Sequence, residues 1–105
     1  MLHAFPGWQG DSGTAVLERL PSGREVVQVT TTVAPDGRTD HEVWLMTAGA
    51  KRLVSLGLLH GTSGTFTVPD GVDVSRFRLV DVSDEPRDGN PAHSGGSIVR
   101  GVLKS

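Results

Sequence analysis

The sequence has no cysteine and no tyrosine, and with two tryptophans and three phenylalanines it is poor in aromatic residues. The absence of cysteine excludes a disulfide scaffold, a thiolate zinc site and a cysteine nucleophile, but it leaves the redox compartment open. Ten Lys+Arg against twelve Asp+Glu give a formal net charge of −2. Proteins that bind nucleic acid by neutralising phosphates are basic, and stacking on single strands needs several aromatic residues, so nucleic acid is not an expected partner.

Long apolar runs are also missing. No stretch approaches the roughly 20 residues that a transmembrane helix needs. Residues 1–10 lack the basic start and the apolar stretch of a signal peptide. We therefore expect the chain as given to be soluble, with any targeting element lying outside it. A chain of 105 residues is long enough to bury one modest core. A single domain is expected.

The sequence does have a period of two residues, interrupted by turns. Residues 24–34 alternate best, with Val27, Val29 and Val33 on one face and polar residues on the other. This pattern is typical of a strand with one solvent-exposed face. Residues 41–47 are apolar at both parities, which predicts a central strand that is covered on both sides.

Two features within these strands carry further predictions. Trp44 and Met46 are interpreted as buried packing residues rather than an exposed binding stripe. Gly57 lies inside the strand expected over residues 51–60. A glycine in a strand indicates a β-bulge or a close approach of another backbone.

Seven short strands are expected in all, separated by turns rich in Gly, Pro and Asp. They cover residues 14–20, 24–34, 41–47, 51–60, 65–68, 77–83 and 97–103. Asp73 is expected to cap a single helical turn before the sixth strand, and residues 84–96 form the longest irregular stretch. No segment keeps the apolar spacing of a long helix. The pattern predicts an all-β fold, an antiparallel β-sandwich of about seven strands that is immunoglobulin-like or Greek-key in type.

The histidines form no recognisable metal motif. None of them is paired with another at the i, i+4 spacing that places two imidazoles on one helical face. They are His3, His41, His60 and His93. We interpret them as exposed or strand-end side chains.

The stretch 84–96 contains the residue types of a nucleophilic triad. His93 and Ser94 are adjacent, and Asp84 and Asp88 lie nearby. A serine cannot easily place its hydroxyl against the imidazole of its sequence neighbour, and no G-x-S-x-G turn exposes it. We predict that the chain is not an enzyme and has no catalytic residue.

The acidic start of the same stretch offers oxygen ligands of the kind that calcium takes. Asp84, Glu85, Asp88 and Asn90 are the candidates. The spacing of an EF-hand loop is absent and Arg87 lies among them. Asp, Asn, Gly and Pro are also the residues that turns require. Turn formation is the better interpretation, so no metal-binding or cofactor-binding residue and no cofactor is predicted.

The central strand and the long loop together carry a family pattern. Residues 41–46 read His-Glu-Val-Trp-Leu-Met, and downstream come Val82-Ser-Asp-Glu-Pro86 and Gly89-Asn-Pro91. The chain resembles the C-terminal extracytoplasmic domain of the anti-sigma-K factor family, which usually reads aromatic-x-Val-Trp-Leu-aliphatic in that strand. The resemblance covers about residues 13–103. The chain departs from the family pattern in having His41 at the position of the aromatic residue and in the loop that follows Pro86.

The resemblance implies a regulatory domain rather than an enzyme. In that family a cytoplasmic helical domain holds an extracytoplasmic-function sigma factor, and one transmembrane helix follows. Proteolysis outside and then within the membrane releases the sigma factor. Residues 1–12 are accordingly expected to be a membrane-proximal stalk remnant or an added tail. Residues 13–105 are expected to be the family's β-sandwich domain, lying on the extracytoplasmic side of the cell membrane as part of a single-pass membrane protein.

The implied role of the domain is to gate this regulated proteolysis. The sigma factor would be held only by the parent protein's N-terminal domain, and the membrane would be reached only through its transmembrane helix. Neither segment is in this sequence. An envelope protease is the other implied partner. The alternative is a secreted or cell-surface β-sandwich module that binds a glycan or a protein. Clustered exposed aromatic or apolar side chains, or a pocket lined by residues 84–96, would favour that alternative.

Overall fold

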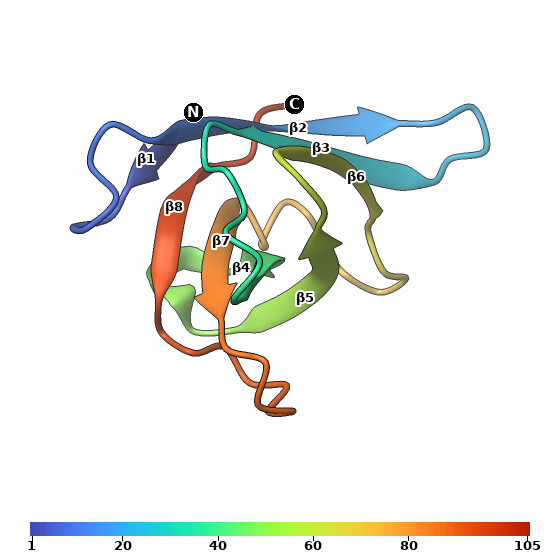
Figure 1. Ribbon diagram of the computed structural model, residues 1–105. Coiled ribbons are helices and arrows are strands. Elements are labelled where there is room, and N and C mark those ends of the chain that lie inside the picture. The colour runs from blue at the N-terminus through green and yellow to red at the C-terminus, as the bar shows by residue number, and fades with distance from the viewer.

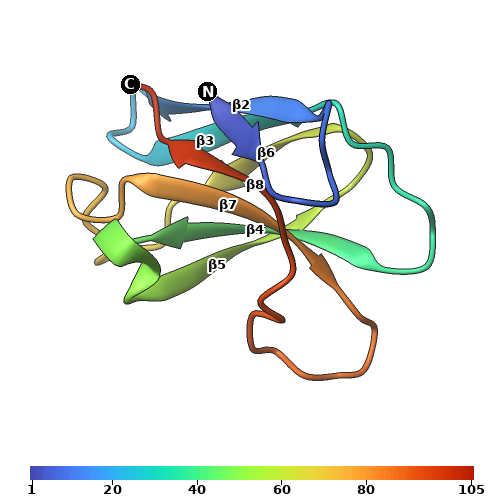
Figure 2. The ribbon, with the colours of Figure 1, turned by 90° about the vertical axis from the view of Figure 1, so that its left-hand side faces the viewer.

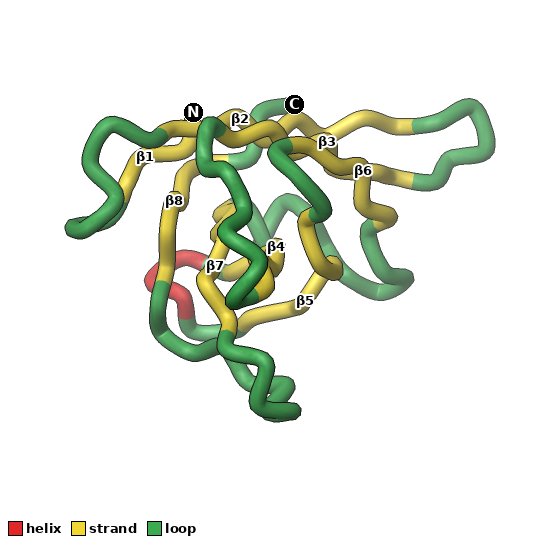
Figure 3. The backbone as a smooth tube through the Cα atoms, viewed as in Figure 1, coloured by secondary structure: helices red, strands yellow, loops and turns green.

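Eight β-strands form one antiparallel sheet in the computed structural model, which describes all residues from 1 to 105. The strand order is β5-β4-β7-β8-β1-β2-β3-β6 (Figure 1). The strands are β1 (Leu2–Ala4), β2 (Ser12–Arg19), β3 (Glu25–Thr31), β4 (Asp40–Met46), β5 (Leu53–Leu59), β6 (Ser63–Thr67), β7 (Leu79–Glu85) and β8 (Ser97–Val102). The only helical element is the short 3-10 turn η1 (Ala48–Ala50), as Figure 3 shows. The predicted all-β antiparallel class is confirmed.

The sheet curls until its two end strands come close together. β5 and β6 lie next to each other at the turn that joins them, although no ladder connects them. In Figure 1, β2 and β3 run across the top of the molecule, and β4, β5 and β7 lie below. Figure 2 shows the same two layers from the side. The two layers of the expected sandwich are therefore opposite walls of one sheet that is nearly closed into a barrel.

The space between the walls is filled by apolar side chains from all eight strands. A cluster of 15 buried residues forms this core. Val27 and Val29 point into it, whereas Gln28 and Thr30 between and beyond them are exposed, as the alternation predicts. β4 pairs with β5 on one side and β7 on the other, which confirms the predicted central strand.

The bulge predicted at Gly57 is present in β5. Val43 pairs with Gly57 and Trp44 pairs with Ser55, so Leu56 is the additional residue. Gly57 has a φ of 133°, and a Cβ there would lie 3.5 Å from the Phe66 ring. Glycine is thus required by the backbone conformation, and the bulge turns β5 toward β6 at the point where the sheet approaches closure.

All seven expected strands exist, with bounds that differ by a few residues, but the strand β1 was not predicted. It lies between β8 and β2, and Leu2 is fully buried in the core. Three residues are too few to show an alternation, so the pattern could not reveal it. The first residues of the predicted stalk remnant or tail therefore contribute a strand to the middle of the sheet.

The single turn predicted at Asp73 is present between β6 and β7. The backbone N–H groups of Arg76 and Phe77 donate to the Asp73 carbonyl at 3.0 and 2.9 Å. The Asp73 carboxylate accepts from the Ser75 hydroxyl at 2.6 Å and from the Ser75 N–H at 2.9 Å. These two donors, the hydroxyl first, hold the pKa of Asp73 below its ordinary value of 3.8.

Leu45 and Leu53 provide a test of where the core lies. Leu45 is fully buried and Leu53 is 38% exposed. We expect Leu45→Ala to lower the free energy of unfolding by about 2–5 kcal/mol, because it leaves a cavity. Leu53→Ala should cost about 1 kcal/mol or less. Urea unfolding followed by circular dichroism measures both, and equal losses would contradict this core.

The Asp73 turn predicts a specific titration. Because the folded pKa lies below the unfolded one, the stabilisation by this carboxylate is present above the unfolded pKa and is lost as the pH falls through the folded pKa. Ser75→Ala should raise the pKa of Asp73 toward its ordinary value. The pKa of Asp36, which is lowered by the backbone N–H of Arg38, should not change. A carboxyl ¹³C NMR titration of both residues measures the effect, and a joint shift would contradict it.

Candidate functional site

A group of buried polar side chains lies on the outer face of the sheet, under the loop of residues 86–96. Val80 and Val82 of β7 point into the core, so Asp81 between them points to the opposite face. There it meets His93 from the loop and Ser97 and Arg100 from β8. We call these four residues the Asp81 cluster.

The carboxylate of Asp81 is the centre of this cluster. It is fully buried and accepts three hydrogen bonds. Its Oδ1 lies 2.8 Å from His93 Nε2, and its Oδ2 accepts from Ser97 Oγ at 2.6 Å and from Arg100 Nε at 2.9 Å. The guanidinium charge compensates the buried carboxylate, and the other two donors satisfy its remaining lone pairs. Sequence reasoning did not single out Asp81, although it is a lone acidic residue between core valines.

His93 fastens the loop to this face through both ring nitrogens. Its Nδ1 accepts from the Gly95 N–H at 2.8 Å, so a neutral ring carries its proton on Nε2 and donates to Asp81. The ring lies 5.0 Å from the ring of Trp44, centroid to centroid. Trp44 in turn donates from Nε1 to Ser83 Oγ at 2.9 Å. The predicted burial of Trp44 is confirmed, and on its outer side the packing partner is a loop histidine.

The neighbouring residue Ser94 is held in the same way. Its N–H donates to the Glu85 carboxylate at 3.1 Å, and its hydroxyl contacts that carboxylate and the carbonyl of Asp84. Nucleophile activation requires a histidine between the serine and the carboxylate. Here Asp81 lies between His93 and Ser97, and the Ser94 hydroxyl bonds to Glu85 instead of an imidazole. The arrangement positions a loop and does not activate a serine.

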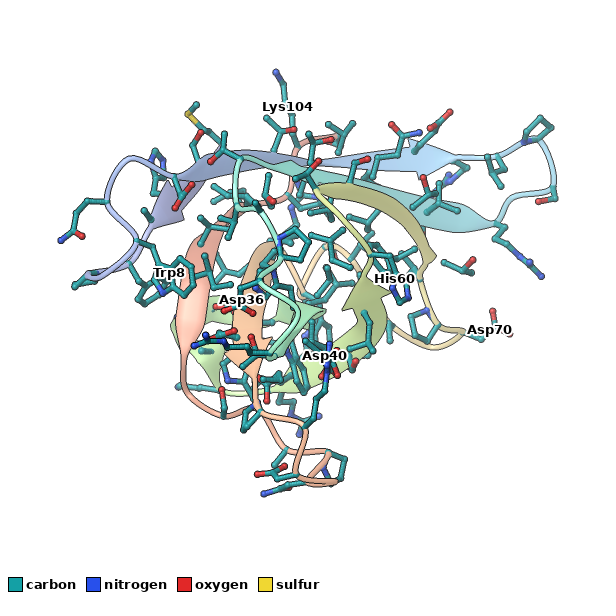
Figure 4. The ribbon with its side chains drawn as sticks, viewed as in Figure 1. Trp8, Asp36, Asp40, His60, Asp70 and Lys104 are labelled. Carbon is teal, nitrogen blue, oxygen red and sulfur yellow. The ribbon has the colours of Figure 1, made fainter.

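The loop also contacts the first residue of β4 and the segment that precedes it. Arg87 donates from Nε to Asp40 at 3.0 Å and from Nη1 to the Gly37 carbonyl at 2.9 Å. Thr39 donates its hydroxyl to the Asp84 carboxylate. Figure 4 labels Asp36, on the segment before β4, and Asp40, the first residue of β4; both lie above the loop in this view. Arg87 therefore joins two loops that are far apart in the sequence.

The candidate calcium ligands serve turn geometry. Asp88 accepts from the Asn90 N–H at 2.9 Å, and Asn90 accepts from the Ala92 N–H at 3.0 Å. These are Asx turns, as the turn interpretation predicts. No three His, Cys, Asp or Glu residues come together in a way that could hold a metal ion. His93 was interpreted as exposed or strand-end, which is wrong, because only 10% of its side chain is exposed and it lies in the loop.

The alternative of a ligand-binding module depends on the exposed apolar side chains and on the hollows near the loop of residues 86–96. The exposed large apolar side chains include no aromatic residue and are Met1, Val16, Leu53, Leu58 and Val102. An open hollow of about 660 Å³ lies between the β2–β3 hairpin and residues 68–72 and is lined mainly by polar groups. The loop 86–96 contributes only Arg87 to a hollow of about 240 Å³ beside His41 and His60.

Removing the Asp81 carboxylate is expected to release the loop. Asp81→Ala leaves the donors of His93, Ser97 and Arg100 without their partner, and we expect a loss of about 3–5 kcal/mol in the free energy of unfolding. Asp88→Ala, which removes an exposed turn carboxylate, is the control and should stay within about 1 kcal/mol. Urea unfolding gives both values, and hydrogen exchange should be faster across residues 86–96 only in Asp81→Ala. Similar behaviour of the two variants would contradict the role of Asp81.

Comparison with known proteins gives one match. The family described as "Anti-sigma-K factor rskA, C-terminal" matches residues 2–97, which is most of the chain and includes β1 and the whole loop of residues 86–96. No curated protein and no solved structure matches. The structure contains no helix that is both long enough and apolar enough to cross a bilayer. The matched segment carries the Val-Trp-Leu strand and the Glu-Pro loop on which the resemblance rests, and the chain belongs to the anti-sigma-K factor C-terminal family.

Proposed function

We propose that this domain is the extracytoplasmic part of a membrane-anchored anti-sigma factor and that it gates the proteolysis that releases the sigma factor. The family match over residues 2–97 is the observation that carries this proposal. The family is one of regulatory, non-enzymatic proteins, and the sigma factor is the partner of the parent protein. This domain acts at a distance from the sigma factor, which is held by the helical N-terminal domain of the parent.

The gate we propose is steric. Endoproteases bind a stretch of extended chain, so a folded body next to a cleavable segment restricts their access. Met1 is 66% exposed, whereas Leu2 is already in the core. The N-terminal end of the chain is therefore held within one residue of the folded barrel. Both termini lie at the same end of the molecule in Figure 2, so the rest of the body extends away from that point.

The gating role predicts the effect of removing the domain. Deleting residues 13–105 from the full-length protein should abolish control of proteolysis, so that transcription from a sigma-dependent reporter no longer responds to the inducing condition. A second variant, in which an unrelated stable barrel replaces these residues, separates shielding from signal recognition. It should restore repression without restoring induction. Unchanged repression and induction in the deletion variant would refute the gating role.

A further inference from the structure

β1 lies between two strands that each place a glycine opposite its central contact, Leu2. Leu2 pairs with Gly13 of β2 on one side and with Gly101 of β8 on the other. A Cβ at Gly101 would lie 2.1 Å from the Met1 carbonyl oxygen and 2.9 Å from the Leu2 Cα. A Cβ at Gly13 would lie 3.2 Å from the Leu2 Cδ1. Any side chain at position 101 would therefore displace β1 itself.

The contacts that hold β1 are few. It spans three residues, and of these only Leu2 has a fully buried side chain. Just after it, the Phe5 N–H donates to the Ile98 carbonyl at 2.9 Å, and Arg100 lies over the Phe5 ring at 5.0 Å. Elements with few buried contacts open at a lower free energy than the whole domain. β1 is therefore the strand that we expect to detach from this sheet at the lowest free energy.

The rest of the sheet has its own connection across the same gap. Beyond β1, the Lys104 N–H donates to the Ala15 carbonyl at 2.9 Å, and the Leu17 N–H donates to the Lys104 carbonyl at 2.6 Å. Leu103 beside them is fully buried. These contacts tie β2 to the chain that follows β8. The body of residues 12–105 can therefore stay folded when β1 leaves.

Residues 5–11 form a compact segment when β1 is paired with β2 and β8. The Trp8 N–H donates to the Phe5 carbonyl and the Asp11 N–H donates to the Trp8 carbonyl, both at 3.0 Å, which makes two successive turns. Trp8 is partly buried and packs against the core cluster. Figure 4 labels it at the left of the molecule, beside β8. Gly7 and Gly10 are exposed and have positive φ. The segment is accessible to a protease, but it is folded too tightly to lie extended in an active-site cleft.

We propose that residues 5–11 are the segment that an endoprotease outside the membrane cuts, and that β1 must leave the sheet before it can do so. The placement of that protease rests on the function proposed above. In the cut, water adds its hydroxyl to the carbonyl carbon and a hydrogen to the amide nitrogen as the peptide bond breaks. Residues 12–105 then depart, and β1 stays with the chain that precedes it.

A disulfide across β1 and β2 tests the required departure. His3 and Ser12 face each other in the ladder, and the chain has no cysteine of its own. His3→Cys/Ser12→Cys locks β1, and Thr14→Cys/Thr30→Cys, between β2 and β3, is the matched control. Subtilisin digests the 105-residue chain, the reaction is stopped and reduced, and mass spectrometry locates the cuts. We expect the oxidised lock to slow cutting within residues 5–11 by about tenfold or more, with reductant restoring the rate and the control pair having no effect. Cutting of the locked chain at the unmodified rate would overturn the proposal.

Gly101→Ala is expected to have the opposite effect to the disulfide, because it weakens the pairing of β1 instead of locking it. The added methyl group lies against the backbone of Met1 and Leu2, so β1 should detach and cutting within residues 5–11 should rise. The reference is Val82→Ala, a core substitution in β7, compared at equal free energy of unfolding. We expect cutting to be about tenfold faster in Gly101→Ala. Leu2→Ala serves as the second variant if Gly101→Ala does not fold. Equal rates at equal stability would show that cutting needs global unfolding, which contradicts a local opening.

Cells that produce the full-length protein test the cleavage site directly. We expect the released domain to begin at a residue between 6 and 12, as identified by mass spectrometry of its N-terminal peptide. A released domain that begins elsewhere would refute the cleavage site and leave the gating function standing. Release of no domain under any condition that activates the sigma factor would refute the gating function, whereas the disulfide and Gly101→Ala results would still report on β1.

Discussion

The two halves of this sheet are joined by β1, a strand of three residues, and beyond it by the hydrogen bonds of Lys104 to Ala15 and Leu17. β5, β4, β7 and β8 form one half, β2, β3 and β6 form the other, and β1 alone lies between them in the ladder. Without β1, the hydrogen-bonding edges of β8 and β2 would be unpaired over the part of each that it covers, and Leu2 would leave a gap in the core. Gly101 is a consequence of this constraint, because a Cβ there would meet the backbone of Met1 and Leu2, whereas a Cβ at Gly13 would meet the Thr30 carbonyl of β3 and the Leu2 side chain.

The second constraint is that one wall of the barrel is covered on both sides. A loop of 11 residues cannot supply a second apolar core, so β7 and β8 place a carboxylate and its partners on the outer face instead. Burying a charge is costly unless it is paired and fully hydrogen-bonded, and Asp81 meets both conditions. Such a cluster is specific about geometry, since each donor has one position that satisfies the carboxylate. It therefore fixes the position of the loop more closely than apolar packing would.

The strands were predictable where the alternation ran for five residues or more, and the central strand β4 was predictable because it is apolar at both parities. β1 was not, because three residues carry no period, and its place is set by contacts with residues about a hundred positions away in β8. The closure of two layers into one sheet also depends on β1. Asp81 could have been noticed as a lone charge among valines. Its partners could not, because they lie 12 to 19 positions along the chain and no short motif links them.

The Asp81 cluster reaches the segment that follows β1 through one residue, Arg100. Arg100 donates to Asp81 and also lies over the ring of Phe5 at the end of β1. Local opening and global unfolding are separate equilibria, so the free energy of detaching β1 can be low while the free energy of unfolding the barrel is high. The gating proposed above requires this separation, because a uniformly rigid fold would never open and a uniformly weak one would never protect the N-terminal segment.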